Sequence, residues 1–168
     1  MHARDLLPWR DFVVETRWSP GVAAIELKNR VGPRRFYAGG GTPFVGESVN
    51  EAEFRFRRAI SYRNSFLPHI QVAVEPAGDR GARVHVRMRM HPAVLTLTVL
   101  WLVGMTIAAI AELSTPWHRH AGPMALVMPV IGIVVVVLSF GLEARKAEAM
   151  LREIYAPAPA LETNEPYR

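Results

Sequence analysis

The sequence predicts an α+β protein in which a small antiparallel sheet with one helix is followed by a two-helix transmembrane hairpin and a C-terminal amphipathic helix. Two observations predict this fold class. Two long runs without a charged residue lie in the C-terminal half, and short segments with alternating apolar and polar residues fill the N-terminal half. The 168 residues therefore divide into a head at 1–91, a hairpin at 92–142, a helix at 143–155 and a flexible tail at 156–168.

The two uncharged runs are Ala93–Ala111 and Pro123–Leu142. At about 1.5 Å of rise per helical residue, each reaches roughly 30 Å, which is the thickness of the hydrocarbon core of a bilayer. A segment in lipid must satisfy its backbone amides internally, so both runs are expected to be helices. Neither run has the N-terminal position of a cleavable signal peptide, and we expect both spans in the mature protein.

The distribution of charge predicts the orientation of the hairpin. Residues 1–91 contain 15 Lys and Arg against 9 Asp and Glu, and Arg145, Lys146 and Arg152 follow the second run. The connector between the runs, 112–122, contains Arg119 as its single Lys or Arg residue. Positive residues that flank a span tend to stay in the cytoplasm, so both termini are expected there and the connector outside.

The head shows the signals of one helix and several strands. Ser19 and Pro20 are suited to the N-cap and first position of a helix over about 20–31, which Gly32 and Pro33 would end. Alternation predicts antiparallel strands, with turns at 50–52 and at the Pro- and Gly-rich 75–81. The expected strands are a short one around 12–14, a hairpin of 44–49 and 53–60, and a pair of 70–74 and 83–90.

Five arginines are expected to share the solvent face of this sheet. Val84, Val86 and Met88 alternate with arginines in the last strand, so one face is apolar and the other basic. The residues predicted to contact the membrane surface or a partner are Arg55, Arg57, Arg83, Arg87 and Arg89. The alternative is a solvated face of a half-buried sheet. Nucleic acid is not expected as a partner, because no aromatic residues are interleaved on that face.

Small residues predict where the spans pack. In the first run Gly104 and Ala108 are four residues apart, and in the second run Ala125, Gly132 and Ser139 recur at heptad spacing. Small side chains let helix backbones approach closely in lipid. The two spans are therefore expected to pack on each other through these residues, or on a partner.

The sequence contains no recognisable catalytic constellation. Cysteine is absent, which excludes disulfides, thiolate zinc sites and a cysteine nucleophile. Gly41–Ser48 approaches a phosphate-binding loop, but Glu47 replaces the required lysine and would repel phosphate. His118 and His120 could bind a metal only with further ligands, and Glu112 is the only carboxylate in the connector. We expect no enzyme activity, no cofactor and no metal.

One segment of the head interrupts the strand pattern. Arg63, Asn64 and Ser65 lie between Tyr62 and Phe66, and Asn and Ser favour turns through local hydrogen bonds to the backbone. The favoured interpretation is a turn, and the alternative is a small polar site packed between the two aromatic residues.

The segment Arg58–Ile70, together with Met88–Pro92 leading into paired spans, resembles a family of small uncharacterised bacterial membrane proteins. The resemblance covers roughly residues 44–155. It implies a cytoplasmic α+β head on two transmembrane helices in the bacterial inner membrane, and it implies no activity, cofactor or catalytic residue.

These features together predict a non-catalytic, membrane-anchored accessory or scaffold subunit. Its expected partners are the lipid bilayer and another membrane protein or further copies of the chain. The alternative is a membrane-tethered sensor or ligand-binding module that holds a small molecule near Tyr62–Phe66.

Overall fold

The computed structural model describes residues 8–33, 41–62, 64–78, 81–114 and 122–156. The connector with His118 and His120, and the expected tail from residue 157 onward, lie outside these residues. The described strands and helices are β1 (Trp9–Thr16), α1 (Pro20–Arg30), β2 (Val31–Pro33), β3 (Phe44–Ser48), β4 (Glu53–Arg58), β5 (His69–Ala77), β6 (Gly81–Arg89), α2 (Pro92–Ser114) and α3 (Gly122–Tyr155).

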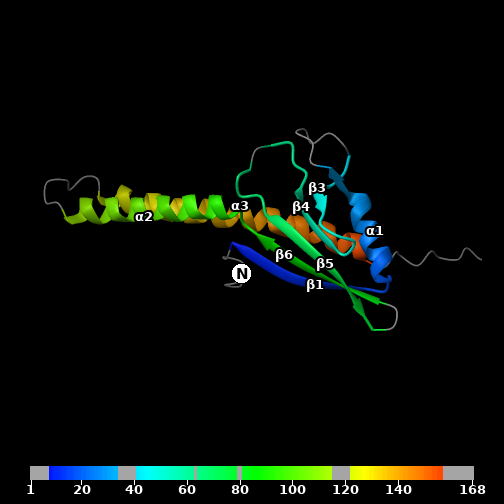
Figure 1. Cartoon of the computed structure of the whole chain (residues 1–168). Helices are drawn as coiled ribbons and strands as arrows, with labels where there is room; N and C mark the ends of the chain where they lie inside the picture. The colour runs from blue at the N-terminus through cyan, green and yellow to red at the C-terminus, as the bar shows by residue number, and fades with distance from the viewer. Residues whose placement is uncertain (1–7, 34–40, 63, 79–80, 115–121, 157–168) are drawn as a thin grey trace, which may run out of the picture.

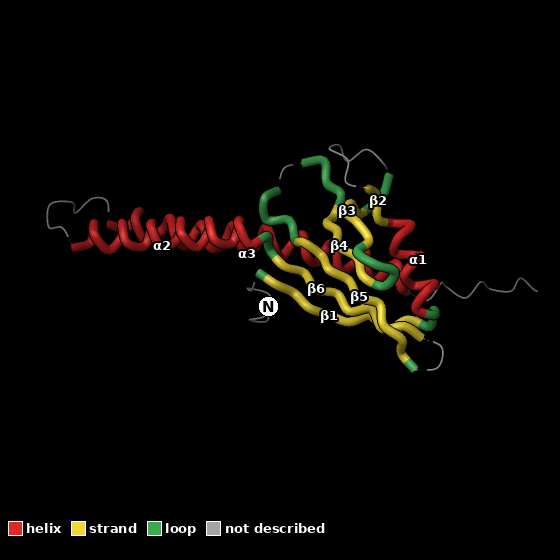
Figure 2. Tube along the Cα trace, in the orientation of Figure 1, coloured by secondary structure: helices red, strands yellow, loops and turns green. Residues whose placement is uncertain are grey.

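The strands form one six-stranded sheet in the order β1-β6-β5-β4-β3-β2, which Figure 2 shows in yellow. The α+β class is confirmed. Four of the five strand pairings are antiparallel, and only β2 and β3 run parallel. The sequence did not indicate β2, because three residues that end in Pro33 carry no alternation that could be recognised.

Helix α1 connects the two edges of the sheet. It begins at Pro20 behind Ser19 at the N-cap position, as expected, although the Ser19 side chain makes no capping hydrogen bond, and it ends at Arg30. Because β1 and β2 lie at opposite edges, the chain must cross one face of the sheet between them. Ala23, Ala24 and Leu27 are the buried residues of α1, and they belong to the core of the head.

Helices α2 and α3 contain segments that are long and apolar enough to cross a membrane. The segments Pro92–Ala111 and Val127–Tyr155 each contain an 18-residue window with a mean hydropathy of 2.3. Their most apolar windows are only 6% and 17% buried, unlike the core helix of a soluble protein. Figure 1 shows the two helices side by side and extending away from the sheet. These properties are those of a membrane protein with two spanning helices.

Helix α3 continues from the hairpin into the head without interruption. It has 34 residues, and its last part passes behind the sheet in Figure 1. The expected helix at 143–155 is therefore present as the direct continuation of the helix of the second span. Its buried residues join those of α1 and the sheet in one core cluster. The α3 members of this cluster are Phe140, Ala144, Ala147, Leu151, Ile154 and Tyr155.

Ion pairs hold the edge strand β1 against α3. Glu148 and Arg152 form a pair one helical turn apart on α3, with Nη2 of Arg152 2.8 Å from Oε1 of Glu148. Nε of Arg10 on β1 lies 2.8 Å from Oε2 of the same carboxylate. The Arg152 guanidinium also lies 5.2 Å from the centre of the Phe12 ring, within the range of a cation–π contact. These contacts fix the orientation of α3 under the sheet.

The two spans pack on each other through only some of the small residues predicted to lie between them. A Cβ atom built on Gly132 would overlap Cζ3 of Trp101, so α2 and α3 approach closely at this glycine. A Cβ atom added to Gly104 in the same way would have no neighbouring atom within 4 Å, and Ala108 is exposed. The expected packing of Gly104 and Ala108 on the second span is therefore wrong, because that face of α2 points away from α3. The side chain of Ala125 lies outside the described part of the chain.

We expect Gly132→Leu to lower the melting temperature of the full chain in detergent, because a larger side chain must displace the Trp101 ring. Overpacking of this kind costs about 1–3 kcal/mol. Gly104→Leu places the same side chain on the open face of α2 and is the matched control, with no change expected. Equal melting temperatures for the two variants would contradict the described packing, and a loss confined to Gly104→Leu would indicate a partner on that face.

Candidate functional site

The five predicted arginines lie on the outer face of the sheet, opposite the core. Arg83, Arg87 and Arg89 are exposed on β6, and Arg55 and Arg57 are exposed on β4. This arrangement follows from alternation, because Val84, Val86 and Met88 between them are buried. The face of the sheet on which each arginine lies was therefore correctly predicted from the alternating pattern.

The outer face also contains as many carboxylates as arginines. Nη1 of Arg89 lies 2.7 Å from Oδ1 of Asp11, and Nη2 of Arg83 lies 3.1 Å from Oε1 of Glu15. Sheet register places opposite charges on neighbouring strands, which stabilises the pairing. The acidic residues of this face are Asp11, Glu15, Glu47, Glu53 and Glu75. The basic face expected from β6 alone is thus a face of balanced charge.

A second polar site lies where the β4–β5 connection meets α3. Among the described residues, Glu143 is the one charged side chain that is buried, with 4% of its surface exposed. It follows directly after the uncharged run of the second span. A carboxylate out of water is costly unless it is paired, so its partners decide how the head and the span fit together.

Three side chains contact the Glu143 carboxylate. Nη1 of Arg58 lies 3.0 Å from Oε2, and the hydroxyl of Tyr62 donates a hydrogen bond of 2.5 Å to Oε1. Nη2 of Arg58 also donates to the Tyr62 hydroxyl at 3.4 Å. Nζ of Lys146 lies 3.5 Å from Oε1, but 55% of the Lys146 side chain is exposed. Tyr62 therefore satisfies Oε1 and Arg58 balances the charge of the carboxylate, but Oε2 accepts no hydrogen bond from the described residues. Lys146 contributes little because exposed ion pairs are weak.

An open pocket of about 500 Å³ lies beside this cluster, and we call it the junction pocket. One wall is the turn after β4 and the other is α3. Oδ1 of Asn64 accepts a hydrogen bond of 2.9 Å from the backbone N–H of Phe66, which holds the turn. The residues that line the junction pocket are Tyr62, Asn64, Ser65, Phe66, Ser139, Leu142, Glu143 and Lys146.

The lining of the junction pocket favours an anionic ligand. Arg58 neutralises Glu143, so the ammonium group of Lys146 remains as excess positive charge. The amide nitrogen of Asn64 and the hydroxyls of Ser65 and Ser139 are further groups that can donate hydrogen bonds. Within the described part of the chain, no three His, Asp or Glu side chains are grouped as metal ligands. The chemistry available in the pocket is binding by hydrogen bonds and charge.

Sequence reasoning identified one wall of this pocket and missed the other. Tyr62, Ser65 and Phe66 line the pocket, in agreement with the alternative that this segment forms a small polar site. The turn at Asn64, which was the favoured interpretation, is also present. Ser139, expected in helix packing, also lines the pocket. Glu143 and Lys146 were missed, although a charge that directly follows an apolar run of this length is a recognisable signal.

No protein family, curated protein or solved structure matches this chain in the comparisons.

Proposed function

We propose that this protein is a non-catalytic, membrane-anchored scaffold or accessory subunit of the bacterial inner membrane, with both termini in the cytoplasm. The observation that supports it most is the continuity of α3, which belongs to the hairpin at one end and to the core of the head at the other. A head joined in this way is held at a fixed height and orientation above the bilayer. A flexible linker, by contrast, would let it rotate freely.

The outer face of the sheet is the proposed docking surface. One face of the sheet is covered by α1 and α3, and the other is open toward the viewer in Figure 1. Its arginines and carboxylates alternate, and Trp9 and Val13 on β1 are half exposed among them. Because charges of both signs are interspersed on this face, their fields largely cancel at a distance, and salt screens what remains beyond a Debye length of about 8 Å. Such a face suits a protein partner with complementary charges better than a uniformly anionic lipid surface.

The partner we propose is the cytoplasmic part of another membrane protein or a second copy of this chain. A photo-crosslinking residue at Val13, on the outer face, is expected to give a discrete adduct in cells. The matched control is Ile25, which is exposed on α1 away from that face. Absence of an adduct from Val13, or the same adduct from both positions, would argue against docking through the sheet.

The proposed topology is tested by single cysteines in a chain that contains none. Ser48→Cys, Ser114→Cys and Glu153→Cys are exposed positions in the head, at the end of α2 and near the end of α3. On intact cells, an impermeant thiol reagent should label only Ser114→Cys, because the positive charge that flanks the spans lies on the side of the head. Labelling at position 48 with protection at position 114 would reverse the orientation.

A second candidate function is a membrane-tethered ligand-binding module. The junction pocket favours it, because polar side chains from the head and from α3 converge there. Pockets that bind small molecules place a few polar groups in this way on a largely preformed scaffold. Stabilisation of the full chain by a soluble metabolite, lost in Tyr62→Ala and unaffected in Val13→Ala, would favour this function over docking.

A further inference from the structure

We infer that the junction pocket binds the phosphate of a phospholipid whose acyl chains lie along α3. This inference rests on the membrane position of α3 and is independent of docking through the sheet. The pocket provides the Lys146 ammonium group together with the hydroxyls of Ser65 and Ser139. A phosphate diester carries one negative charge and several acceptor oxygens, and it is matched by one cation and a set of neutral donors.

The charge of the cluster supports an anion rather than a cation. The Glu143 carboxylate is occupied by the Arg58 guanidinium at 3.0 Å and the Tyr62 hydroxyl at 2.5 Å. Its negative charge is therefore already compensated inside the protein. Lys146 is 55% exposed, and its 3.5 Å contact with Glu143 is long. Its ammonium group can turn toward a ligand at little cost, because no strong contact is broken.

The position of the pocket supports a lipid as the source of the phosphate. Leu142 and Ser139, which line the pocket, belong to the last turns of the apolar run of the second span. This is the level at which the headgroups of a bilayer meet a spanning helix. A ligand in the pocket would therefore meet both the head and the bilayer surface.

An apolar stripe leads from the pocket along the spanning part of α3. Its residues are separated by four, three and four positions, so they lie on one face of the helix. All are among the exposed large hydrophobic side chains of the chain. The stripe consists of Ile131, Val135, Leu138 and Leu142, and Leu142 also lines the pocket. An acyl chain attached to a phosphate in the pocket would follow this stripe into the hydrocarbon region.

The test measures lipid binding to the full chain in detergent by native mass spectrometry and by thermal stabilisation. The probes are phosphatidylglycerol, diacylglycerol with the same acyl chains, and inorganic phosphate. Phosphatidylglycerol should bind and stabilise the chain, and diacylglycerol, which lacks the phosphate, should not. Lys146→Gln should lower the affinity for phosphatidylglycerol about tenfold, the loss expected when a charged hydrogen bond is removed. Because Lys146 is exposed, the variant should keep the melting temperature of the wild-type chain without lipid.

Lys28→Gln is the matched control, because it removes the same charge from an exposed position on α1. It should bind phosphatidylglycerol as the wild-type chain does. Equal stabilisation by diacylglycerol, or undiminished binding in Lys146→Gln, would overturn the inference. Stabilisation by inorganic phosphate equal to that by the lipid would also overturn it and would assign the pocket to a soluble anion. None of these outcomes depends on the sheet, so the docking function is tested separately by crosslinking at Val13.

Discussion

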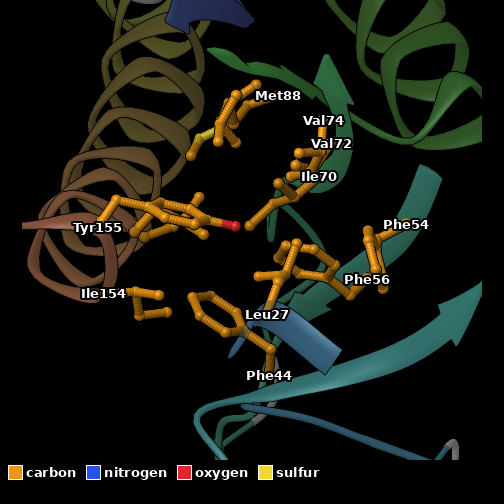
Figure 3. Close-up of a cluster of buried hydrophobic side chains, with 14 of the residues drawn as sticks. Leu27, Phe44, Phe54, Phe56, Ile70, Val72, Val74, Met88, Ile154 and Tyr155 are labelled. Carbon is orange, nitrogen blue, oxygen red and sulfur yellow. The ribbon is translucent and has the colours of Figure 1, made fainter. Parts of the chain in front are cut away.

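A chain that ends at Leu142 is expected to lose the folded head, although residues 1–91 remain intact. The deletion removes the part of α3 that supplies Ala147, Leu151 and Tyr155, each 2% exposed or less, to the core. In Figure 3, Tyr155 points from α3 toward Ile70 and Leu27, and Ile154 faces Phe44. Burial of each large apolar side chain contributes about 1.5–3 kcal/mol. The loss of the three large residues Leu151, Ile154 and Tyr155 is comparable with the total stability of a small domain, about 5–15 kcal/mol.

The measurement is limited proteolysis with near-ultraviolet circular dichroism of the detergent-solubilised chain. The matched control is a chain that ends at Ala156, which keeps all of α3 and should behave as the full chain does. A protease-resistant head with an unchanged aromatic spectrum in the chain that ends at Leu142 would contradict the description. Such a result would show that residues 1–91 form an independent domain.

The second large effect is expected at the buried ion pair between the head and the span. Arg58→Met leaves the Glu143 carboxylate in a buried position with only the Tyr62 hydroxyl and the distant Lys146 as partners. Removing one partner of a buried pair costs about 3–5 kcal/mol. For a chain of this size, that corresponds to a fall in melting temperature on the order of 10 °C. Tyr62→Phe should cost less, about 1.5–3 kcal/mol for a hydrogen bond to a charged group, because the Arg58 pair remains.

A double-mutant cycle separates the pair from its surroundings. The double variant Arg58→Met, Glu143→Leu lacks both charges. It should lose less stability than the two single variants lose together, since no charge is then left unpaired. Thermal unfolding of the four proteins in the same detergent measures the coupling. Strictly additive losses would mean that Arg58 and Glu143 act independently, which conflicts with the 3.0 Å contact.

The sequence predicted those parts of the fold that depend on local periodicity. Alternation placed Arg83 and Arg87 on the outer face, and the uncharged runs predicted both long helices. What it could not predict depends on contacts between distant segments. The pairing of Arg83 with Glu15 joins residues 68 positions apart, so a stripe that is basic within β6 becomes neutral in the assembled sheet. No pattern within one strand contains that information.

The same distinction applies to the junction pocket and to the spans. The turn at Asn64 was predictable, because its side chain bonds to the backbone two residues away. The contact of Tyr62 with Glu143 joins residues 81 positions apart and could not be predicted from the sequence. In the hairpin, small-residue spacing correctly identified Gly132 but not the face of α2 that meets it. A helix that is apolar on all sides does not reveal its packing face through hydrophobicity.

Helix α3 is one continuous helix from the apolar hairpin to the core of the head, and we expect it to be rigid. Spin labels on cysteines introduced at Val135 and Glu153, both exposed, test it directly in lipid nanodiscs. The positions are 18 residues apart, which is five helical turns, so the labels lie on one face and about 27 Å apart along the axis. A narrow distance distribution centred near that separation is the predicted result. A broad distribution, or one centred well below it, would show a bend or break between span and head and would contradict the claim.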